Sequence, residues 1–223
     1  GMVVLVPDTT TNYNHPELGI ATVNILEKLG YEVILPNSRC CGRPMLSNGM
    51  MSQAKANVDF NISSIYPFVE KGAKLVGIEP SCALGFISDF SDLASEPEKA
   101  KEISENTMLI EDFFLYATKE EDFQFTNPPQ NQKVVFHGHC HQKALVGTTS
   151  AMEVLKTIPG LEPVEIKSGC CGMAGSFGFY KDHFDISMQI GENTLFPAIR
   201  EENDDVIVVS EGVSCRQQIE QGT

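Results

Sequence analysis

Residues 161–178 read LEPVEIKSGCCGMAGSFG, a strand-like stretch followed by two adjacent cysteines and, from Gly169 on, a glycine at every third position. Residues 161–166 are predicted to form a strand, and the glycines predict the loop that leaves it. A disulfide between sequence neighbours is strained, so we do not expect this cysteine pair to form a stabilising disulfide. Thiolates grouped beside flexible backbone suit a metal or an iron–sulfur cluster better.

The vicinal pair is repeated nearer the start of the chain, where residues 39–44 read RCCGRP. Subtracting 130 from the residue numbers maps the second Cys-Cys-Gly onto the first without a gap, and maps Gly160 onto Gly30. Cys215 maps onto Cys82 after a three-residue insertion. Two ordinary α/β units could look alike, but matched vicinal cysteines favour an internal duplication.

Each half has the expected order strand–helix–strand–helix–strand. The expected strands lie at 2–6, 31–35, 73–78, 133–136, 161–166 and 206–209, and the main helices at 18–29, 50–69, 142–158 and 182–200. This alternation predicts an α/β fold, in which parallel sheets are flanked by helices and the two halves are related by a pseudo-twofold axis.

Three parts of the chain follow from this pattern. Residues 2–91 would form a first repeat with a degenerate site, and residues 133–223 a second repeat with a complete four-cysteine site. Residues 92–132 would be a connection that is helical in two pieces, broken near Asn106, and ends in a linker at 127–132.

Four cysteines of the second half each follow the end of a predicted strand: Cys140, Cys170, Cys171 and Cys215. Because ligands of open parallel sheets bind beyond the carboxyl ends of the strands, these thiols should meet at one edge of the sheet. Four thiolates suit Zn²⁺ or a [4Fe–4S] cluster. The spacing lacks the two C-x-x-C knuckles of a zinc ribbon, which favours the iron–sulfur cluster over zinc, and zinc over free thiols.

The first half offers only Cys40, Cys41 and Cys82, and the offset of 130 puts Thr10 in the place of Cys140. Threonine is a poor ligand for zinc or for an iron–sulfur cluster. We therefore expect this half to have lost its site or to keep a three-thiol remnant, and its cysteines are the weaker candidates for metal ligands.

Residues 137–141 read HGHCH. In an extended conformation His137, His139 and His141 share one face, opposite Cys140. These histidines could donate hydrogen bonds to cluster sulfides, relay protons or bind metal. Alternatively, one or two of them only cap the end of the strand by bonding backbone carbonyls.

The glycine-rich loop lacks the residue order of a phosphate-binding loop. We expect its glycines, Gly172 and Gly175 among them, to present backbone N–H groups to an anionic cluster. Arg43, Lys143 and Arg216 flank cysteines and could offset the charge of a cluster or meet an anionic partner, although a solvated surface is the default role of each.

The composition narrows the function classes. The chain has 223 residues, 42% of them hydrophobic, a net charge of −14 and seven cysteines. The negative charge argues against nucleic acid and anionic membrane surfaces as partners. The odd number of cysteines and the lack of a secretory signal fit a reducing compartment, so we expect a cytoplasmic protein that reaches the inner membrane only through partners. We also expect a piece cut from a larger protein.

Several stretches resemble the cysteine-rich CCG domain, which occurs in heterodisulfide reductase and in the iron–sulfur subunits of glycolate, lactate and glycerol-3-phosphate oxidising enzymes. The likeness is greatest to the C-terminal region of long FAD-linked 2-hydroxy-acid oxidases. The stretches that carry it are residues 7–9, 40–44, 79–82, 137–141, 168–175 and 214–219.

This resemblance implies an oxidoreductase in which electrons pass from a 2-hydroxy acid to a flavin, and then through iron–sulfur centres to a quinone or another acceptor. It implies a [4Fe–4S] cluster on Cys140, Cys170, Cys171 and Cys215. The flavin and ferredoxin-like domains would be partners in the missing part of the enzyme, with FAD bound there, and the fragment would not be competent alone.

The chain departs from heterodisulfide reductase, whose motif ends in C-x-x-C. Gln218 stands three residues after Cys215, and Gly85 three residues after Cys82. The resemblance therefore does not extend to a noncubane cluster or to disulfide reduction. Two other functions stay open: a docking module whose cysteine site holds zinc or is empty, and a thiol reductase that cycles Cys170 and Cys171 through a disulfide.

Overall fold

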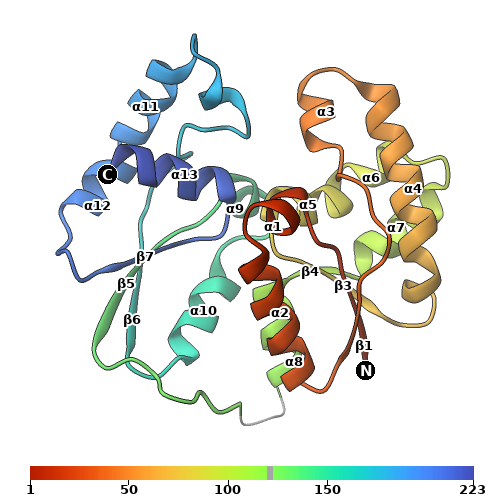
Figure 1. The fold of residues 1–223 in the computed structure, drawn as a ribbon, viewed down its shortest axis with the longest axis horizontal. Helices are drawn as coiled ribbons and strands as arrows, with labels where there is room; N and C mark the ends of the chain where they lie inside the picture. The colour runs from red at the N-terminus through yellow and green to blue at the C-terminus, as the bar shows by residue number, and fades with distance from the viewer. Residues whose placement is uncertain (120–122) are drawn as a thin grey trace. The chain divides into compact units, whose positions relative to one another are not determined.

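A computed structural model describes residues 1–119 and 123–223. The chain divides into two compact units, Gly1–Lys119 and Glu120–Thr223. Each unit contains one sheet, and every strand pair in both sheets is parallel (Figure 1). The α/β fold with parallel sheets that the sequence predicted is confirmed.

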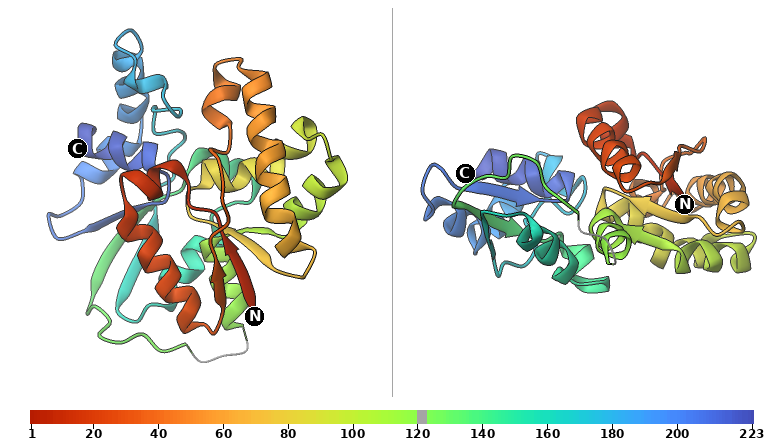
Figure 2. Two further views of the ribbon diagram at one scale, coloured as in Figure 1. Left: turned by 45° about the vertical axis from the view of Figure 1, so that its right-hand side comes forward. Right: turned by 90° about the horizontal axis from the view of Figure 1, so that it is seen from below.

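The sheet of the first unit has the order β2-β1-β3-β4. Its strands are β1 (Met2–Leu5), β2 (Glu32–Ile34), β3 (Lys74–Gly77) and β4 (Thr107–Leu109). The two inner strands are apolar and almost fully buried, because helices cover both faces of the sheet (Figure 2).

The helices of the first unit are α1 (Thr9–Tyr13), α2 (Pro16–Lys28), α3 (Arg43–Ser47), α4 (Met51–Val69), α5 (Pro80–Ser88), α6 (Phe90–Leu93), α7 (Pro97–Glu105) and α8 (Ile110–Thr118). Val4 packs in a core with residues of α4, α5, α6 and α7. Its neighbours Val3 and Leu5 pack in a separate core with residues of α2 and α8. Successive residues of a strand face opposite ways, so the two cores lie on opposite faces of the sheet.

The connection expected at 92–132 needs a correction. Its two helical pieces are α7 and α8, but the break near Asn106 contains β4, which pairs with β3. Three residues are too few for a period-2 pattern to be recognised. Residues up to Lys119 belong to the first unit, and Glu120, Glu121 and Asp122 lie outside the described residues.

The sheet of the second unit has the order β6-β5-β7. Its strands are β5 (Gln132–His137), β6 (Leu161–Glu165) and β7 (Ile207–Ser210). Its helices are α9 (Cys140–Leu145), α10 (Thr149–Thr157), α11 (Phe184–Glu192), α12 (Leu195–Arg200) and α13 (Val213–Gly222), with a 3-10 turn, η1 (Phe177–Phe179).

Two long helices expected in this unit are each divided. The helix expected at 142–158 consists of α9 and α10, which are separated at Gly147 with a φ of 79°. A left-handed glycine of this kind commonly ends a helix. The helix expected at 182–200 consists of α11 and α12, separated at Asn193 and Thr194.

Among the residues that the structure describes, no helix combines the length and apolarity that crossing a membrane requires.

Candidate metal centre

The four cysteines of the second unit lie at the carboxyl ends of its three strands. Cys140 is the first residue of α9, just beyond β5. Cys170 and Cys171 lie in the loop after β6, and Cys215 is the third residue of α13, which follows β7. Since β5 lies between β6 and β7, the loops that carry the four cysteines leave neighbouring strands at the same edge of the sheet.

Hydrogen bonds between side chains link the thiols in a row. Cys140 bonds Cys170, Cys170 bonds Cys171, and Cys171 bonds Cys215. Cys171 and Cys215 are buried in the hydrophobic core of the unit, whereas Cys140 and Cys170 are only partly buried. The row of thiols therefore runs from the core toward the surface.

The row contains two sulfurs that favour the thiolate form. Hydrogen bonds from the thiols of Cys140 and Cys171 lower the pKa of Cys170 to about 2, and the N–H of Gly172 lies 3.3 Å from its sulfur. A hydrogen bond from Cys171, with the nearby His137, lowers the pKa of Cys215 to about 4. The pKa values of Cys140 and Cys171 are raised, because these thiols share their protons with the neighbouring sulfurs. Thiolates are the form that binds metal.

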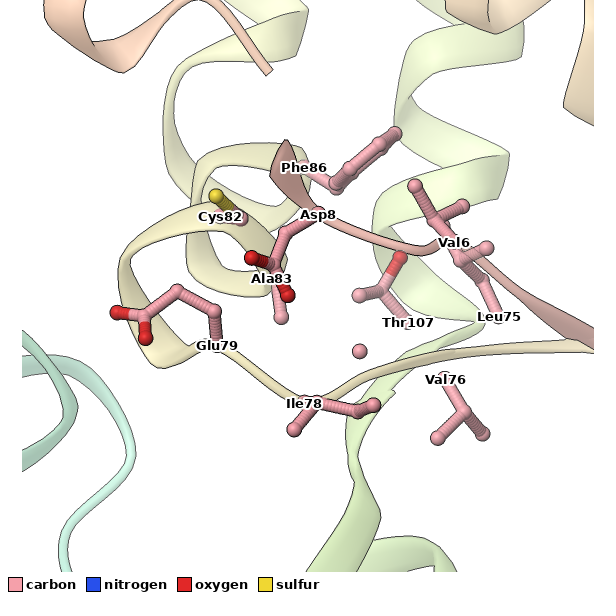
Figure 3. A pocket seen from close by; sticks show the side chains of 11 residues that line it. Val6, Asp8, Leu75, Val76, Ile78, Glu79, Cys82, Ala83, Phe86 and Thr107 are labelled. Atoms are coloured by element: carbon pink, nitrogen blue, oxygen red, sulfur yellow. The ribbon is translucent and has the colours of Figure 1, made fainter. Parts of the chain in front are cut away.

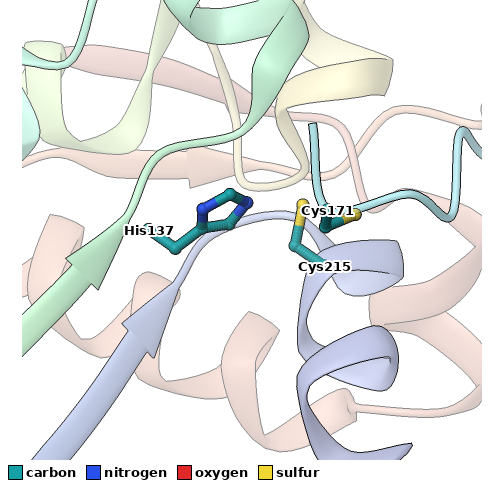
Figure 4. Close-up of side chains that lie close together, drawn as sticks. All are labelled: His137, Cys171 and Cys215. Atoms are coloured by element: carbon teal, nitrogen blue, oxygen red, sulfur yellow. The ribbon is translucent and has the colours of Figure 1, made fainter. Parts of the chain in front are cut away.

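His137 lies beside the two buried thiols at the end of β5 (Figure 4). Its side chain is fully buried, and its Nδ1 lies 2.7 Å from the hydroxyl oxygen of Ser168. Its Nε2 has no oxygen or nitrogen partner among the described residues. One ligand atom each of His137, Cys171 and Cys215 lies within 4.8 Å of the others. Because this nitrogen lies with the sulfurs of Cys171 and Cys215, it could also contact a group that the thiols bind.

The three histidines do not share one face, because the extended chain ends within this stretch. β5 ends at His137, and α9 begins at Cys140 with His139 as its N-cap. His139 is buried against Gly212, where any Cβ would overlap the imidazole ring. The ring centroid of His141 lies 6.4 Å from that of His139. Only His137 joins the group of potential ligand atoms with the thiols, within the part of the chain that is described.

The two glycines expected at the site differ in their surroundings. Gly172 has a φ of 101°, and a Cβ there would overlap the carbonyl oxygen of Ser187. Its N–H donates to the sulfur of Cys170. Gly175 has a φ of 68°, but a Cβ there would meet open space. Gly172 therefore contacts the thiols directly, while Gly175 shapes the turn.

The basic residues beside the cysteines hold the loops together. Lys143 Nζ donates to the carbonyl oxygens of Ser168 and Gly169, at 2.7 and 3.0 Å. Arg216 donates to the carbonyl oxygens of Ser210 and Glu211. In the first unit, Arg43 forms an ion pair with Asp89, at 2.6 Å.

The sequence did not point to Ser168 as a site residue. Its hydroxyl bonds His137, and its carbonyl oxygen accepts from Lys143. The only signal was its position directly before the Gly-Cys-Cys-Gly motif, which says nothing of partners elsewhere in the chain.

The three thiols of the first unit also lie together. Cys41 Sγ is 3.2 Å from Cys82 Sγ, and Cys40 is hydrogen-bonded to Cys41. Cys82 is the third residue of α5, as Cys215 is of α13. All three thiols are partly buried and free.

The residue that matches Cys140 is Thr9, which corrects the expectation of Thr10. Leu5 pairs with Val76, and Phe136 pairs with Val209. Val76 and Val209 each lie six residues before the matched cysteines of α5 and α13. Thr9 and Cys140 each lie four residues beyond Leu5 and Phe136, and each is the first residue of a helix.

The spread of the four thiols in the second unit bears on which metal would fit. A single tetrahedral Zn²⁺ with bonds of about 2.3 Å to sulfur requires sulfur–sulfur separations of about 3.8 Å between all four ligands. In the described part of the chain, only His137, Cys171 and Cys215 form a group of three or more such atoms within 4.8 Å. Cys140 and Cys170 lie outside that group, so the four thiols together suit a polynuclear cluster better than one ion.

Each of the two α/β units has a parallel sheet with clustered thiols at its carboxyl edge. This repetition defines a duplicated cysteine-rich protein. The model of the CCG cysteine-rich domain family matches residues 7–87 and 134–220, and the chain belongs to this family.

The chain is similar to one of the subunits of the anaerobic glycerol-3-phosphate dehydrogenase of Escherichia coli K12. The two are 31% identical over 214 residues, which cover 95% of this chain and 53% of the relative. Lactate utilization protein A of Bacillus licheniformis is 34% identical over 167 residues, which cover 72% of this chain and 67% of the relative. The chain thus spans about half the length of the dehydrogenase subunit.

Proposed function

We propose that this chain is an iron–sulfur electron-transfer domain of a larger oxidoreductase. The observation that carries the proposal is the row of four thiols at the carboxyl edge of the second sheet. The four sulfurs are too far apart for one metal ion to contact them all. Membership of the CCG family and similarity to a dehydrogenase subunit support an oxidoreductase role.

Cys140, Cys170, Cys171 and Cys215 would hold a [4Fe–4S] cluster, which when bound supplies a one-electron couple. Hydrogen bonds to the sulfurs are one of the determinants of the potential of such a cluster. The N–H of Gly172 donates to one of these sulfurs, and Ser168 orients His137 so that Nε2 faces the buried thiols. His139, His141 and Gly175 would act farther out, by shaping the surroundings of the site.

The longer enzyme would be a flavin-dependent 2-hydroxy-acid oxidoreductase of the glycolate or D-lactate type. Its flavin and ferredoxin-like domains would deliver electrons to this domain, which would pass them to a quinone or another acceptor. The dehydrogenase and lactate-utilization relatives, and the half-length coverage of the dehydrogenase subunit, support a place in such an assembly.

A zinc-bound docking module is the second candidate. The compact group of His137, Cys171 and Cys215 favours it, because three ligands within 4.8 Å of one another could hold one Zn²⁺. In that case the remaining thiols, Cys140 and Cys170, would have no role as metal ligands.

The test is anaerobic reconstitution with iron and sulfide, followed by measurement of metal content, visible absorption and, after reduction with dithionite, EPR. We expect Cys171→Ala to bind about four fewer irons per chain than the wild type and to lose one EPR signal. Cys40→Ala, at the matched position of the first unit, should keep that signal.

Stoichiometric zinc without a reducible iron chromophore would contradict the electron-transfer proposal and favour the docking module. Loss of the same EPR signal in both variants would contradict a cluster confined to the second unit.

A further inference from the structure

The first unit contains a polar pocket of about 330 Å³ beside its thiols. Cys40, Cys41 and Cys82 line it, together with Thr9 and several hydroxyl and amide side chains. Every lining residue belongs to the first unit. The volume is at the lower end of the range of small-molecule sites, and a molecule of a few heavy atoms would fit.

A second, much smaller cavity lies on the core side of Cys82, among mostly apolar side chains (Figure 3). Its volume is about 10 Å³, close to the minimum for one water molecule. The polar pocket is therefore the one of the two that could admit a ligand to the thiols.

The pocket lies at the position where the first unit has no counterpart of the Cys140 thiol. Thr9 occupies the position of Cys140, and its hydroxyl is hydrogen-bonded to Cys40 in the way that Cys140 is bonded to Cys170. Thr9 is exposed and lines the pocket. Metal sites that bind exogenous ligands keep one coordination position free of protein side chains.

One cation, Arg39, lines the pocket and could meet an anion. Its guanidinium stacks on the ring of Phe60, 4.1 Å from the centroid, and takes part in none of the ion pairs among the described residues. The backbone of Arg39 is clamped by the buried side chain of Asn61, at 2.7 and 3.0 Å. Asp8, the acid in the lining, is already engaged as the N-cap of α1 and by the hydroxyl of Thr11.

We propose that the first unit is a ligand-binding site, in which Cys40, Cys41 and Cys82 hold an iron–sulfur cluster through three thiolates and a small carboxylate enters the pocket. The carboxylate would bind where Thr9 leaves a position without a thiolate, with Arg39 neutralising its charge. This adds a small-molecule site to the electron-transfer role of the second unit, and it does not depend on that role.

The test uses the full chain with Cys140→Ala and Cys170→Ala, which disable the site of the second unit at partly buried positions. After anaerobic reconstitution we expect about four irons per chain and, once the protein is reduced with dithionite, an EPR signal that shifts on addition of glycolate, the probe carboxylate. Far-UV circular dichroism checks that the double variant is folded. The iron content and the glycolate shift of the wild type are measured in parallel, so that the first unit is also tested with the second unit intact.

Adding Thr9→Cys should supply the fourth thiolate. We expect the iron to be retained, the glycolate shift to disappear, and iron loss on treatment with ferricyanide to slow. Thr10→Cys is the matched control, and it should leave the glycolate shift unchanged because Thr10 lies one residue beyond the matched position.

Arg39→Gln should keep the iron and raise the Kd of glycolate about tenfold. Absence of iron from the double variant while the wild type binds it would overturn this inference and leave the proposed function standing. A glycolate shift that survives Thr9→Cys would also overturn it. Absence of iron from the wild type as well would overturn both this inference and the proposed function.

Discussion

Gly172 is a residue of the cysteine loop at which both the backbone conformation and the close packing oppose a side chain. Its φ of 101° is unfavourable for any residue with a Cβ, and the space a Cβ would need is occupied by the carbonyl of Ser187. The buried Gln218 donates to that same carbonyl, at 3.0 Å. The loop therefore approaches α11 and α13 so closely that only glycine fits.

Gly172→Ala should lower the free energy of unfolding by at least about 2 kcal/mol, because strain and overlap add. Gly175→Ala is the control: it requires a similar positive φ but meets open space, so it should cost about 1 kcal/mol. Urea denaturation followed by circular dichroism measures both. Equal losses would contradict the close approach at Gly172.

Ser168→Ala tests the support of His137. Removing the hydroxyl leaves Nδ1 of a fully buried imidazole without its partner, which should cost about 1–3 kcal/mol. The midpoint potential of the reconstituted cluster should also shift, because the orientation of Nε2 is no longer held. Ser176→Ala, at an exposed serine of the same loop, should change neither quantity. If the midpoint potential of Ser168→Ala were unchanged, the orientation of His137 would have no influence on the cluster.

At the scale of elements, α9 is fastened to the cysteine loop by one side chain. Lys143, in the last turn of α9, donates to two consecutive carbonyl oxygens just before Cys170. This contact connects the helix that carries Cys140 to the loop that carries the vicinal pair, and so it helps to keep the thiols together.

Lys143→Met should keep the apolar stem of the side chain and lose both hydrogen bonds. We expect a modest loss of stability, of about 1 kcal/mol, and faster amide hydrogen exchange at residues 168–171. Lys156→Met, at an exposed lysine of α10, is the control and should not change exchange in the loop. Unchanged exchange in Lys143→Met would mean that other contacts hold the loop.

The elements that the sequence predicted well are those with a long or strongly apolar pattern. α4 was expected at 50–69 and is found at Met51–Val69, and β1 was expected at 2–6 and is found at Met2–Leu5. β4 could not be recognised, since its three residues belong to the sheet only through pairing with β3. The division between α9 and α10 was missed because a single glycine inside a helical pattern can also be tolerated, and only the φ of 79° at Gly147 shows that the helix ends there.

At the scale of the whole molecule, each unit has its own hydrophobic core. Buried residues of the first unit form cores on both faces of its sheet, and those of the second unit form a core around Val135, Phe196 and the buried thiols. A unit with its own core and its own sheet has what independent folding requires.

We expect the fragments 1–119 and 120–223 to fold separately when each is expressed alone. Each should show a cooperative urea transition by circular dichroism, and 120–223 should bind about four irons on reconstitution. The intact chain is the control, and its urea midpoints are compared with those of the two fragments. A fragment without a cooperative transition would mean that its core is incomplete without the other unit.

Local sequence features were enough to predict the parallel α/β pattern and the gathering of the cysteines at strand ends. Apolar runs and helical spacing indicate the elements, and loops after parallel strands share one edge of the sheet. The folded structure was needed to show that His137, and not His139 or His141, lies with the thiols, and that Thr9 matches Cys140. These outcomes depend on strand register and on hydrogen bonds between segments far apart in the chain, such as that between His137 and Ser168, which no local pattern encodes.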